Sequence, residues 1–333
     1  MIRRAAICAL AILTLSALAF AQPHARTFTF TYSFTVRNPE QGKPLRVWFP
    51  KAHSDRYQTV RLISTKGDLP LKQTRQGVND NEMFYAETQS ADKPEYHFVA
   101  VYQVTRYERL GFEEAELHPT VLQPAILEQF LKPDKLVPVT GKPSAIAARE
   151  VRGKTTELAK ARALYDYIFA TMRYDKSGTG WGHGDAVWAC SSKRGNCTDF
   201  HSLFASMARS QGIPTRFAIG FPLPANEHAG DIPGYHCWAD FYLKGKGWIP
   251  VDISEAWKHP DKKDYFFGAH DVNRIQFTVG RDLTLSPKQS GPPLNYFVYP
   301  YAESDGKQIQ NIRNDFSFRD NAVIKQAAVR RQP

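Results

Sequence analysis

Hydrophobic and polar residues alternate strictly near the start of the chain. Phe28, Phe30, Tyr32, Phe34 and Val36 alternate with Thr and Ser. A period of two built from β-forming residues predicts a strand with one buried face. Pro, Gly, Asn and Asp separate the further short strands that we predict at 45–49, 59–64, 83–87 and 96–107. Short strands with turn residues between them are typical of a β-sandwich, which we assign to residues 22–110.

The hydrophobic period changes after residue 155. Leu158, Ala161, Tyr165, Ile168 and Met172 recur at steps of three and four, which predicts an amphipathic helix. A second helix is predicted from Cys197 to about Ser210, where a Gly-Ile-Pro sequence at 212–214 ends it. Strands are predicted at 215–221, 235–243 and 248–253. Helices before strands, without strand-helix-strand alternation, indicate an α+β domain.

Five segments follow from these patterns. We expect a signal peptide at 1–21, the β-sandwich-like domain at 22–110 and a linker with a short helix near 126–131 at 111–153. The α+β core then spans 154–300, and 301–333 holds one strand at 310–318 and a basic tail.

The first 21 residues have the pattern of a secretory signal peptide. Arg3 and Arg4 precede an apolar stretch from Ala5 to Leu18, and Ala19-Phe20-Ala21 has the small-x-small form of a cleavage site. Cleavage after Ala21 predicts a periplasmic or secreted protein. A single membrane anchor is the alternative, but the apolar run is shorter than the roughly 20 residues that a span needs. No later run is long enough, so we expect no stable membrane anchor.

The formal charge of +10 does not point to nucleic acid. Lys and Arg are scattered among Asp and Glu, so no basic stripe forms the footprint of a nucleic-acid interface. Loss of Arg3 and Arg4 with the signal peptide would leave a charge of about +8.

Three cysteines remain beyond the predicted cleavage site: Cys190, Cys197 and Cys237. Exported proteins meet an oxidising compartment in which spare thiols pair. An odd number suggests one thiol kept free. We therefore hypothesise a Cys190–Cys237 disulfide with Cys197 free.

Cys197 follows Asn196, which is a good N-cap. A thiol in the first helical turn meets unpaired N–H groups and the positive end of the helix dipole, and both lower its pKa. The same amides can stabilise an oxyanion. The alternative for this segment alone is a small buried hydrophobic residue.

His236 and Asp252 are placed by a predicted hairpin. A three-residue loop at 244–246 sets Trp238 opposite Asp252, so that His236 and Asp252 become diagonal neighbours on one face. A two-residue loop would put them on opposite faces. His236 could then act as base for the Cys197 thiol, with Asp252 orienting the imidazole.

Four blocks in this order resemble the transglutaminase-like superfamily of papain-like folds. They are Gly-Asn-Cys-Thr-Asp-Phe at 195–200, Gly-Ile-Pro-Thr-Arg at 212–216, Tyr-His-Cys-Trp at 235–238 and Trp-Ile-Pro-Val-Asp at 248–252. The resemblance covers about 155–260 and implies a Cys197-His236-Asp252 triad that acts on amides through a thioester. It also implies an oxyanion residue upstream of the nucleophile, for which Trp181 and Tyr174 are candidates.

Other residues are expected to line the cleft. Trp238, Tyr235 and Glu255 are the candidates, and the segment from Phe221 to Pro233 is expected to form one rim. His201, one turn after Cys197, is interpreted as a supporting or surface group rather than a second base. Cys190 and Cys197 are too far apart for the usual zinc-ligand spacing, and we expect neither a metal nor a cofactor.

The sequence therefore predicts an exported, thiol-dependent enzyme that hydrolyses peptide or amide bonds. Its partner would be a peptide or protein substrate, with the cell envelope as one source. Two alternatives stay open. One is an acyltransferase that joins glutamine to an amine, and the other is a non-catalytic binding module in which the triad is blocked.

Overall fold

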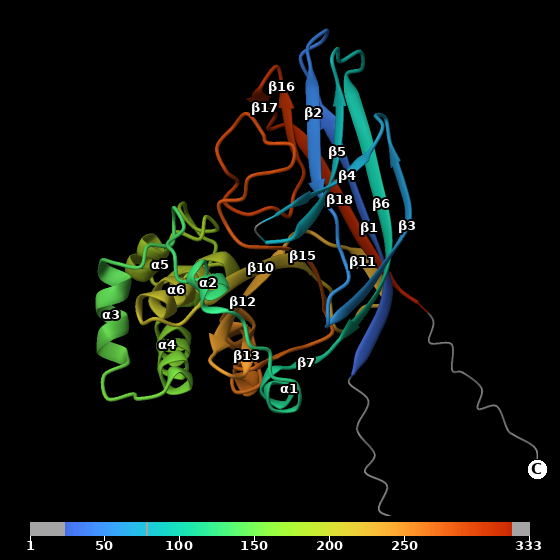
Figure 1. Ribbon diagram of the computed structural model, residues 1–333. Helices are drawn as coiled ribbons and strands as arrows, with labels where there is room; N and C mark the ends of the chain where they lie inside the picture. The colour runs from blue at the N-terminus through green and yellow to red at the C-terminus, as the bar shows by residue number, and fades with distance from the viewer. Residues whose placement is uncertain (1–23, 78, 322–333) are drawn as a thin grey trace, which may run out of the picture.

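The structure is a computed structural model that describes residues 24–77 and 79–321. Two five-stranded sheets make up its β-rich part, at the upper right of Figure 1. In order across the first sheet lie β11 (Ala229–Asp231), β18 (Ile312–Asp320), β1 (Ala25–Arg37), β6 (Glu95–Tyr107) and β3 (Gln58–Gly67). In order across the second lie β17 (Lys307–Gln308), β16 (Tyr301–Ser304), β2 (Leu45–Pro50), β5 (Asn81–Thr88) and β4 (Lys72–Gln76). The predicted signal peptide and the basic tail beyond residue 321 lie outside the described residues.

Aromatic side chains join the two sheets face to face. All five alternating residues of β1 are buried, which confirms the predicted strand. The ring of Phe34 in β1 lies 5.1 Å from that of Phe49 in β2 and 5.0 Å from that of Phe98 in β6, measured between centroids. Because each aromatic residue buries a large apolar area, this cluster is a main source of stability in the sandwich.

The sandwich takes strands from both ends of the chain. β18 runs antiparallel to β1, with Tyr32 opposite Phe316. β16 pairs with β2, with Trp48 opposite Tyr301. The sequence predicted a sandwich within residues 22–110, but the sandwich extends beyond that range. Alternation identifies the faces of a strand but not its partner.

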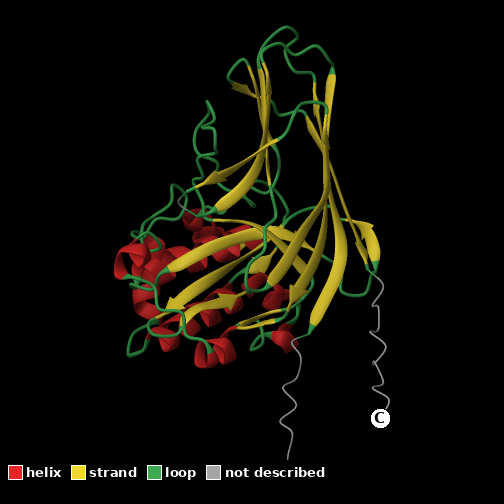
Figure 2. Cartoon of the chain, turned by 45° about the vertical axis from the view of Figure 1, so that its right-hand side comes forward, coloured by secondary structure: helices red, strands yellow, loops and turns green. Residues whose placement is uncertain are grey.

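The α+β part is built on a four-stranded antiparallel sheet with helices on one face (Figure 2). Its strands, in order, are β13 (Gly247–Val251), β12 (His236–Leu243), β10 (Thr215–Pro222) and β15 (Arg274–Val279). The central helix α6 (Cys197–Ser210) packs on β12 and β10. Around it lie α3 (Lys142–Glu150), α4 (Glu157–Thr171) and α5 (Ala186–Ser192). Both predicted long helices, α4 and α6, are confirmed.

The segment from 111 to 153 is more than a linker. It contains α1 (Gly111–Leu117), α2 (Pro124–Glu128) and α3. Ala147 of α3 is fully buried in the same hydrophobic cluster as Phe204 of α6, so the core begins before residue 154, where the sequence placed its start. The described helices include none that is both long and apolar enough to cross a membrane.

The hairpin of β12 and β13 has the predicted register. Ala239 lies opposite Val251, and Leu243 lies opposite Gly247, which leaves a three-residue loop. The pairing ends at Ala239 and Val251, so Asp252 directly follows the last paired residue of β13. The hairpin therefore brings His236 and Asp252 to one end of the sheet.

Candidate active site

Cys197 begins α6, as predicted. The Asn196 side chain accepts a hydrogen bond from the Thr198 N–H (2.9 Å), and the Asp199 carboxylate accepts one from the Asn196 N–H (2.9 Å). This reciprocal pair is a capping box. It holds the thiol in the first turn, where the amides and the helix dipole favour a thiolate. The Cys197 residue is 2% exposed.

Asp199 also ties a glycine-rich loop to the start of this helix. Its two carboxylate oxygens accept hydrogen bonds from the N–H groups of Gly182 (2.7 Å) and Gly184 (3.0 Å). A Cβ on Gly195 would lie 2.3 Å from an Asp199 oxygen, and Gly195 has φ of +148°. Glycine is therefore required two residues before Cys197, because a side chain there would displace the carboxylate that orders the loop.

His236 and Asp252 form a direct hydrogen bond. His236 Nε2 lies 2.7 Å from Asp252 Oδ2, and both residues are buried. Asp252 is the N-cap of α7 (Ile253–Lys258), and its Oδ1 accepts hydrogen bonds from the Glu255 N–H and the Ser254 hydroxyl, each at 3.1 Å. The same Oδ2 accepts a hydrogen bond from Arg274 Nη1 (2.8 Å). The carboxylate is thus held in one orientation, and Nδ1 of His236 is left for the thiol.

The charges at this site support a thiolate beside an imidazolium. Burial alone would raise the pKa of the Cys197 thiol, but hydrogen bonds with Cys237 and His236 and the charge on His236 bring it well below its usual range. Burial alone would lower the pKa of His236, yet Asp252 and Cys197 raise it to about 10. Burial likewise opposes the charge on Asp252, while His236 and Arg274 hold its pKa well below the usual value.

A protein-family model matches the part of the chain that holds Cys197, His236 and Asp252. Residues 144–253 match the model of the transglutaminase-like superfamily. The chain carries a transglutaminase-like core. The sequence had placed the resemblance at about 155–260, so the match begins earlier, within α3.

Relatives extend beyond the transglutaminase-like core. A Haemophilus influenzae protein described as uncharacterized is 28% identical over 329 residues, covering 86% of this chain and 88% of that protein. The crystal structure of a protein from Cytophaga hutchinsonii, described as a candidate cysteine protease, is similar with a TM-score of 0.57 at 14% identity, over 90% of this chain and 98% of that one. At this identity the likeness shows a shared fold. The periplasmic domain of TgpA from Pseudomonas aeruginosa matches 72% of this chain and 92% of its own, with a TM-score of 0.38 and 14% identity.

The three described cysteines of this transglutaminase-like core and its surroundings are all free and buried. The hypothesis of a Cys190–Cys237 disulfide is therefore wrong. Cys190 lies in the hydrophobic cluster shared by α4 and α6, whereas Cys237 lies in the cluster that continues into the sandwich. Cys237 Sγ contacts the Thr198 hydroxyl at 3.7 Å, next to Cys197. A count of cysteines could not show that folding places Cys190 and Cys237 in different hydrophobic clusters.

The two oxyanion candidates lie in different surroundings. Tyr174 belongs to β8 (Arg173–Tyr174), which runs parallel to β9 (Arg194–Gly195) and places Tyr174 beside Gly195. Burial and then the nearby Cys197 charge raise the pKa of its hydroxyl. The Trp181 indole N–H instead donates to the Gly178 carbonyl (3.1 Å) within its own loop. The arrangement therefore favours Tyr174.

Of the three cleft-lining candidates, two lie at the site and one does not. The Tyr235 hydroxyl lies 2.7 Å from that of Thr198, and a Glu255 oxygen lies 4.0 Å from His236 Nε2. Trp238 is fully buried, with its ring centroid 6.0 Å from that of His236. The prediction that Trp238 lines the cleft is therefore wrong. It supports the His236 ring from within the core.

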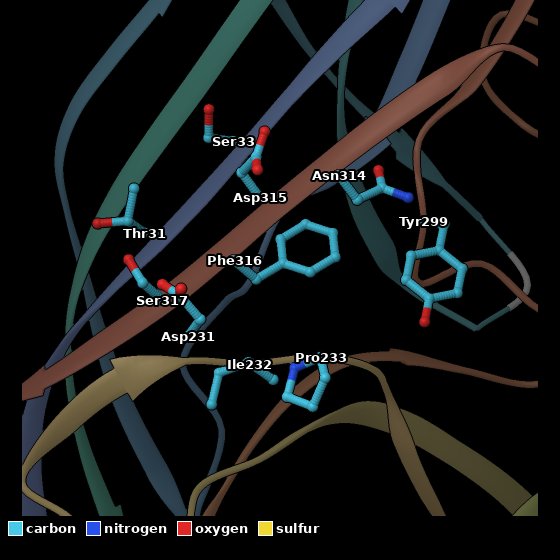
Figure 3. Close-up of a pocket in the computed structure, with 10 residues that line it drawn as sticks. All are labelled: Thr31, Ser33, Asp231, Ile232, Pro233, Tyr299, Asn314, Asp315, Phe316 and Ser317. Carbon is cyan, nitrogen blue, oxygen red and sulfur yellow. The ribbon is translucent and has the colours of Figure 1, made fainter.

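The predicted rim segment joins the sandwich rather than closing over Cys197 and His236. Its β11 pairs with β18, so that Ile232 and Pro233 form one wall of a cavity of about 410 Å³. Figure 3 shows Phe316 above Ile232 and Pro233, Tyr299 beside them, and the carboxylates of Asp231 and Asp315 nearby. The residues that line this cavity do not include Cys197 or His236.

Of two supporting residues, Arg274 was not recognised from the sequence, and His201 was predicted only as a supporting or surface group. Arg274 is 22 residues beyond Asp252 on β15, and only the folded sheet brings them together. His201 was noted one turn after Cys197, and the structure places it fully buried between Cys197 and Ile253. Its position four residues after Cys197 was the one local signal for such a role.

Proposed function

We propose that this chain is a thiol-dependent hydrolase of peptide or amide bonds, with Cys197 as nucleophile. The observation that carries the proposal is the 2.7 Å hydrogen bond between His236 and Asp252 beside a cysteine at a helix N-terminus. Such a carboxylate-imidazole-thiol order is the arrangement that activates nucleophiles in covalent catalysis. The candidate cysteine protease of the same fold supports the same reaction class.

The reaction would proceed through a thioester. The Cys197 thiolate attacks the amide carbon, a C–S bond forms, and the carbonyl electrons move to oxygen. His236 in its protonated form gives a proton to the leaving amine as the C–N bond breaks. His236 then takes a proton from water, whose oxygen attacks the thioester and releases the acid with the thiolate. Asp252 holds the imidazole in one orientation and stabilises its positive charge throughout.

Tyr174 and the amides of the first turn of α6 would stabilise the oxyanion. Tyr235 and Glu255 would line the approach to the thiol. The substrate would be a peptide or protein, with the cell envelope as the proposed source, because residues 1–21 have the pattern of an export signal. If water is replaced by an amine in the second step, the same thioester gives acyl transfer.

A non-catalytic binding module is the second candidate, because one observation favours it. Cys197 is 2% exposed, His236 is 4% exposed and Asp252 is fully buried. A thiol so enclosed is poorly accessible to a substrate in this structure. Reactivity of Cys197 in the folded protein is therefore what separates the two functions.

The test is the rate of Cys197 labelling by iodoacetamide from pH 5 to 10, read by mass spectrometry in the wild type and in His236→Ala. The hydrolase predicts fast labelling well below the free-thiol pKa of about 8.5, slowed in the variant. Slow labelling with an ordinary pKa in both proteins would favour the binding module. Release of ammonia or peptide, compared with incorporation of a fluorescent amine, then distinguishes hydrolysis from acyl transfer.

A further inference from the structure

His201 is a buried histidine that the proposed reaction does not use. It lies in the first half of α6, one turn after Cys197, and its side chain is fully buried. A buried polar ring is costly unless both nitrogens find partners. The two partners of this ring are the backbone carbonyl of Cys197 and the backbone N–H of Ile253, which directly follows Asp252.

The hydrogen bonds define the protonation of the ring. The backbone N–H of Ile253 donates to His201 Nε2 at 3.0 Å, so this nitrogen carries no proton. The proton is then on Nδ1, which lies 2.8 Å from the Cys197 carbonyl oxygen and donates to it. A protonated Nε2 would point its hydrogen at that of Ile253. The ring is therefore neutral and present as one tautomer.

The charged and titratable groups around the ring agree with a neutral form. Asp252 Oδ1 lies 3.6 Å from Nε2 but accepts its hydrogen bonds from Ser254 and Glu255. Cys237 Sγ lies 3.8 Å from Nδ1. Burial and the positive charge of His236 disfavour a second cation here, against the charges of Asp252 and Cys197 that would favour one.

We propose that His201 is a positioning residue that joins the nucleophile to the segment carrying Asp252. Its ring spans from the backbone of Cys197 to the backbone of Ile253, which directly follows Asp252. Cys197 is on α6 and Asp252 lies between β13 and α7, so no regular hydrogen-bond ladder connects them. The bridge sets their separation, and His236 works between them. This inference rests on the proposed function, because it assigns the bridge to the alignment of that triad.

Three variants divide the bridge into its parts. His201→Asn can keep a donor near the Nδ1 position, and His201→Gln can offer an acceptor near the Nε2 position. His201→Leu keeps neither. Ser206→Ala is the matched control, because Ser206 is a buried residue of the same helix whose hydroxyl bonds to the Pro138 carbonyl, away from the triad.

The measurement is the pH profile of iodoacetamide labelling at Cys197, corrected for the folded fraction. We expect His201→Leu to lower the labelling rate at pH 6 by about 10–100-fold, the effect typical of a misplacement near 1 Å. The Asn and Gln variants should fall between it and the wild type, and Ser206→Ala should keep the wild-type profile. A wild-type profile in folded His201→Leu would overturn the inference. A rate loss equal to the loss of folded protein would do so too, since it would indicate a structural role alone.

A measurement on the wild type keeps the inference open to test if His201→Leu does not fold. Nitrogen-15 NMR of histidine should show His201 with a protonated Nδ1 and an unprotonated Nε2 from pH 5 to 9. A ring that gains a proton in this range, or the opposite tautomer, would refute the bridge. Failure of the proposed function would give a different result, which is slow labelling of Cys197 with an ordinary pKa in the wild type itself.

Discussion

Arg274 donates a hydrogen bond of 2.8 Å to the oxygen of Asp252 that also faces His236. Arg274 is 2% exposed and also contacts Asp271 at 3.2 Å. One buried cation thus serves two carboxylates. Removal of one partner of a buried ion pair leaves an uncompensated charge, which is more costly than the loss of an exposed pair.

Replacement of Arg274 with methionine should therefore lower the free energy of unfolding by about 3–5 kcal/mol. It should also raise the pKa of Asp252, because the guanidinium is one of the groups that lower it. Urea denaturation gives the first quantity, and iodoacetamide labelling of Cys197 reports on the second through slower labelling near pH 6. Arg209→Met is the control: this buried arginine pairs with Asp134 at 2.7 Å, and its loss should destabilise the fold without changing the labelling profile.

Asp252→Asn tests the orientation of His236. The amide cannot stabilise an imidazolium as a carboxylate does, and it favours the wrong tautomer. Such a change lowers turnover by about 10⁴-fold in triads of this type. We expect a loss of about 10³–10⁴-fold in acylation of Cys197 by p-nitrophenyl acetate. Asp271→Asn removes a carboxylate that contacts Arg274 but not His236, and activity there should fall much less. Equal losses in the two variants would contradict a specific role for Asp252.

Asp240 should govern part of the stability at acid pH. It is 1% exposed and bonds to Arg109 and Arg216, each at 2.7 Å. Burial alone would raise its pKa, but the two arginines hold it below the usual value. Because the unfolded carboxyl titrates near 3.9, this stability is fully present above about pH 4 and is lost as pH falls through the lower folded-state pKa.

Asp240→Asn should therefore destabilise the protein at pH 7 by about 3–5 kcal/mol and flatten the dependence of stability on pH below 4. Denaturation curves at a series of pH values measure both effects. Asp264→Asn removes an exposed carboxylate paired with Arg162 and serves as the control. A wild-type pH dependence in Asp240→Asn would show that other carboxylates carry the acid sensitivity.

The elements best predicted from the sequence are those with local signals at both ends. Helix α6 begins after the Asn196 cap and ends before Gly212 and Pro214, and its predicted limits agree with the structure. The hairpin register followed from one loop length, since a side-chain period of two leaves few alternatives once the loop is set. These two elements carry Cys197 and His236, and Asp252 directly follows the hairpin.

What could not be predicted depends on packing between distant segments. The pairing of β1 with β18 joins residues almost 300 positions apart, and the paired strands β2 and β16 are also distant in the sequence. Neither Arg274 nor the bridge through His201 has a sequence pattern of its own, because each is defined by the partner that folding supplies. The misassigned Trp238 has the same origin: the pattern indicated its face of the sheet, but not that Arg274 and His270 pack against its ring and that it is fully buried.

The thiols offer a direct check of the corrected disulfide hypothesis. Cys190, Cys197 and Cys237 are all free, so a protein that begins at residue 22 should give three thiols when titrated with DTNB in guanidinium chloride without reductant. Cys197 alone should react quickly in the folded state. Cys190 and Cys237 are fully buried, and burial and the Cys197 charge raise the pKa of the Cys237 thiol. Non-reduced peptide mapping that finds Cys190 joined to Cys237 would refute this arrangement.

The two oxyanion candidates can be separated by their effect on acylation. Tyr174→Phe removes the hydroxyl of the residue that pairs with Gly195; burial and the Cys197 charge raise the pKa of this hydroxyl and keep it a donor at neutral pH. Loss of one oxyanion donor costs about 10²–10³-fold, so the burst of p-nitrophenol from p-nitrophenyl acetate should slow by that amount. Alkylation by iodoacetamide forms no oxyanion, and its rate should stay unchanged. Trp181→Phe should leave both rates near the wild type, because its indole N–H already donates to Gly178. A slow burst in Trp181→Phe and a normal one in Tyr174→Phe would reverse the assignment and imply that the loop at 178–184 turns its indole toward the thioester.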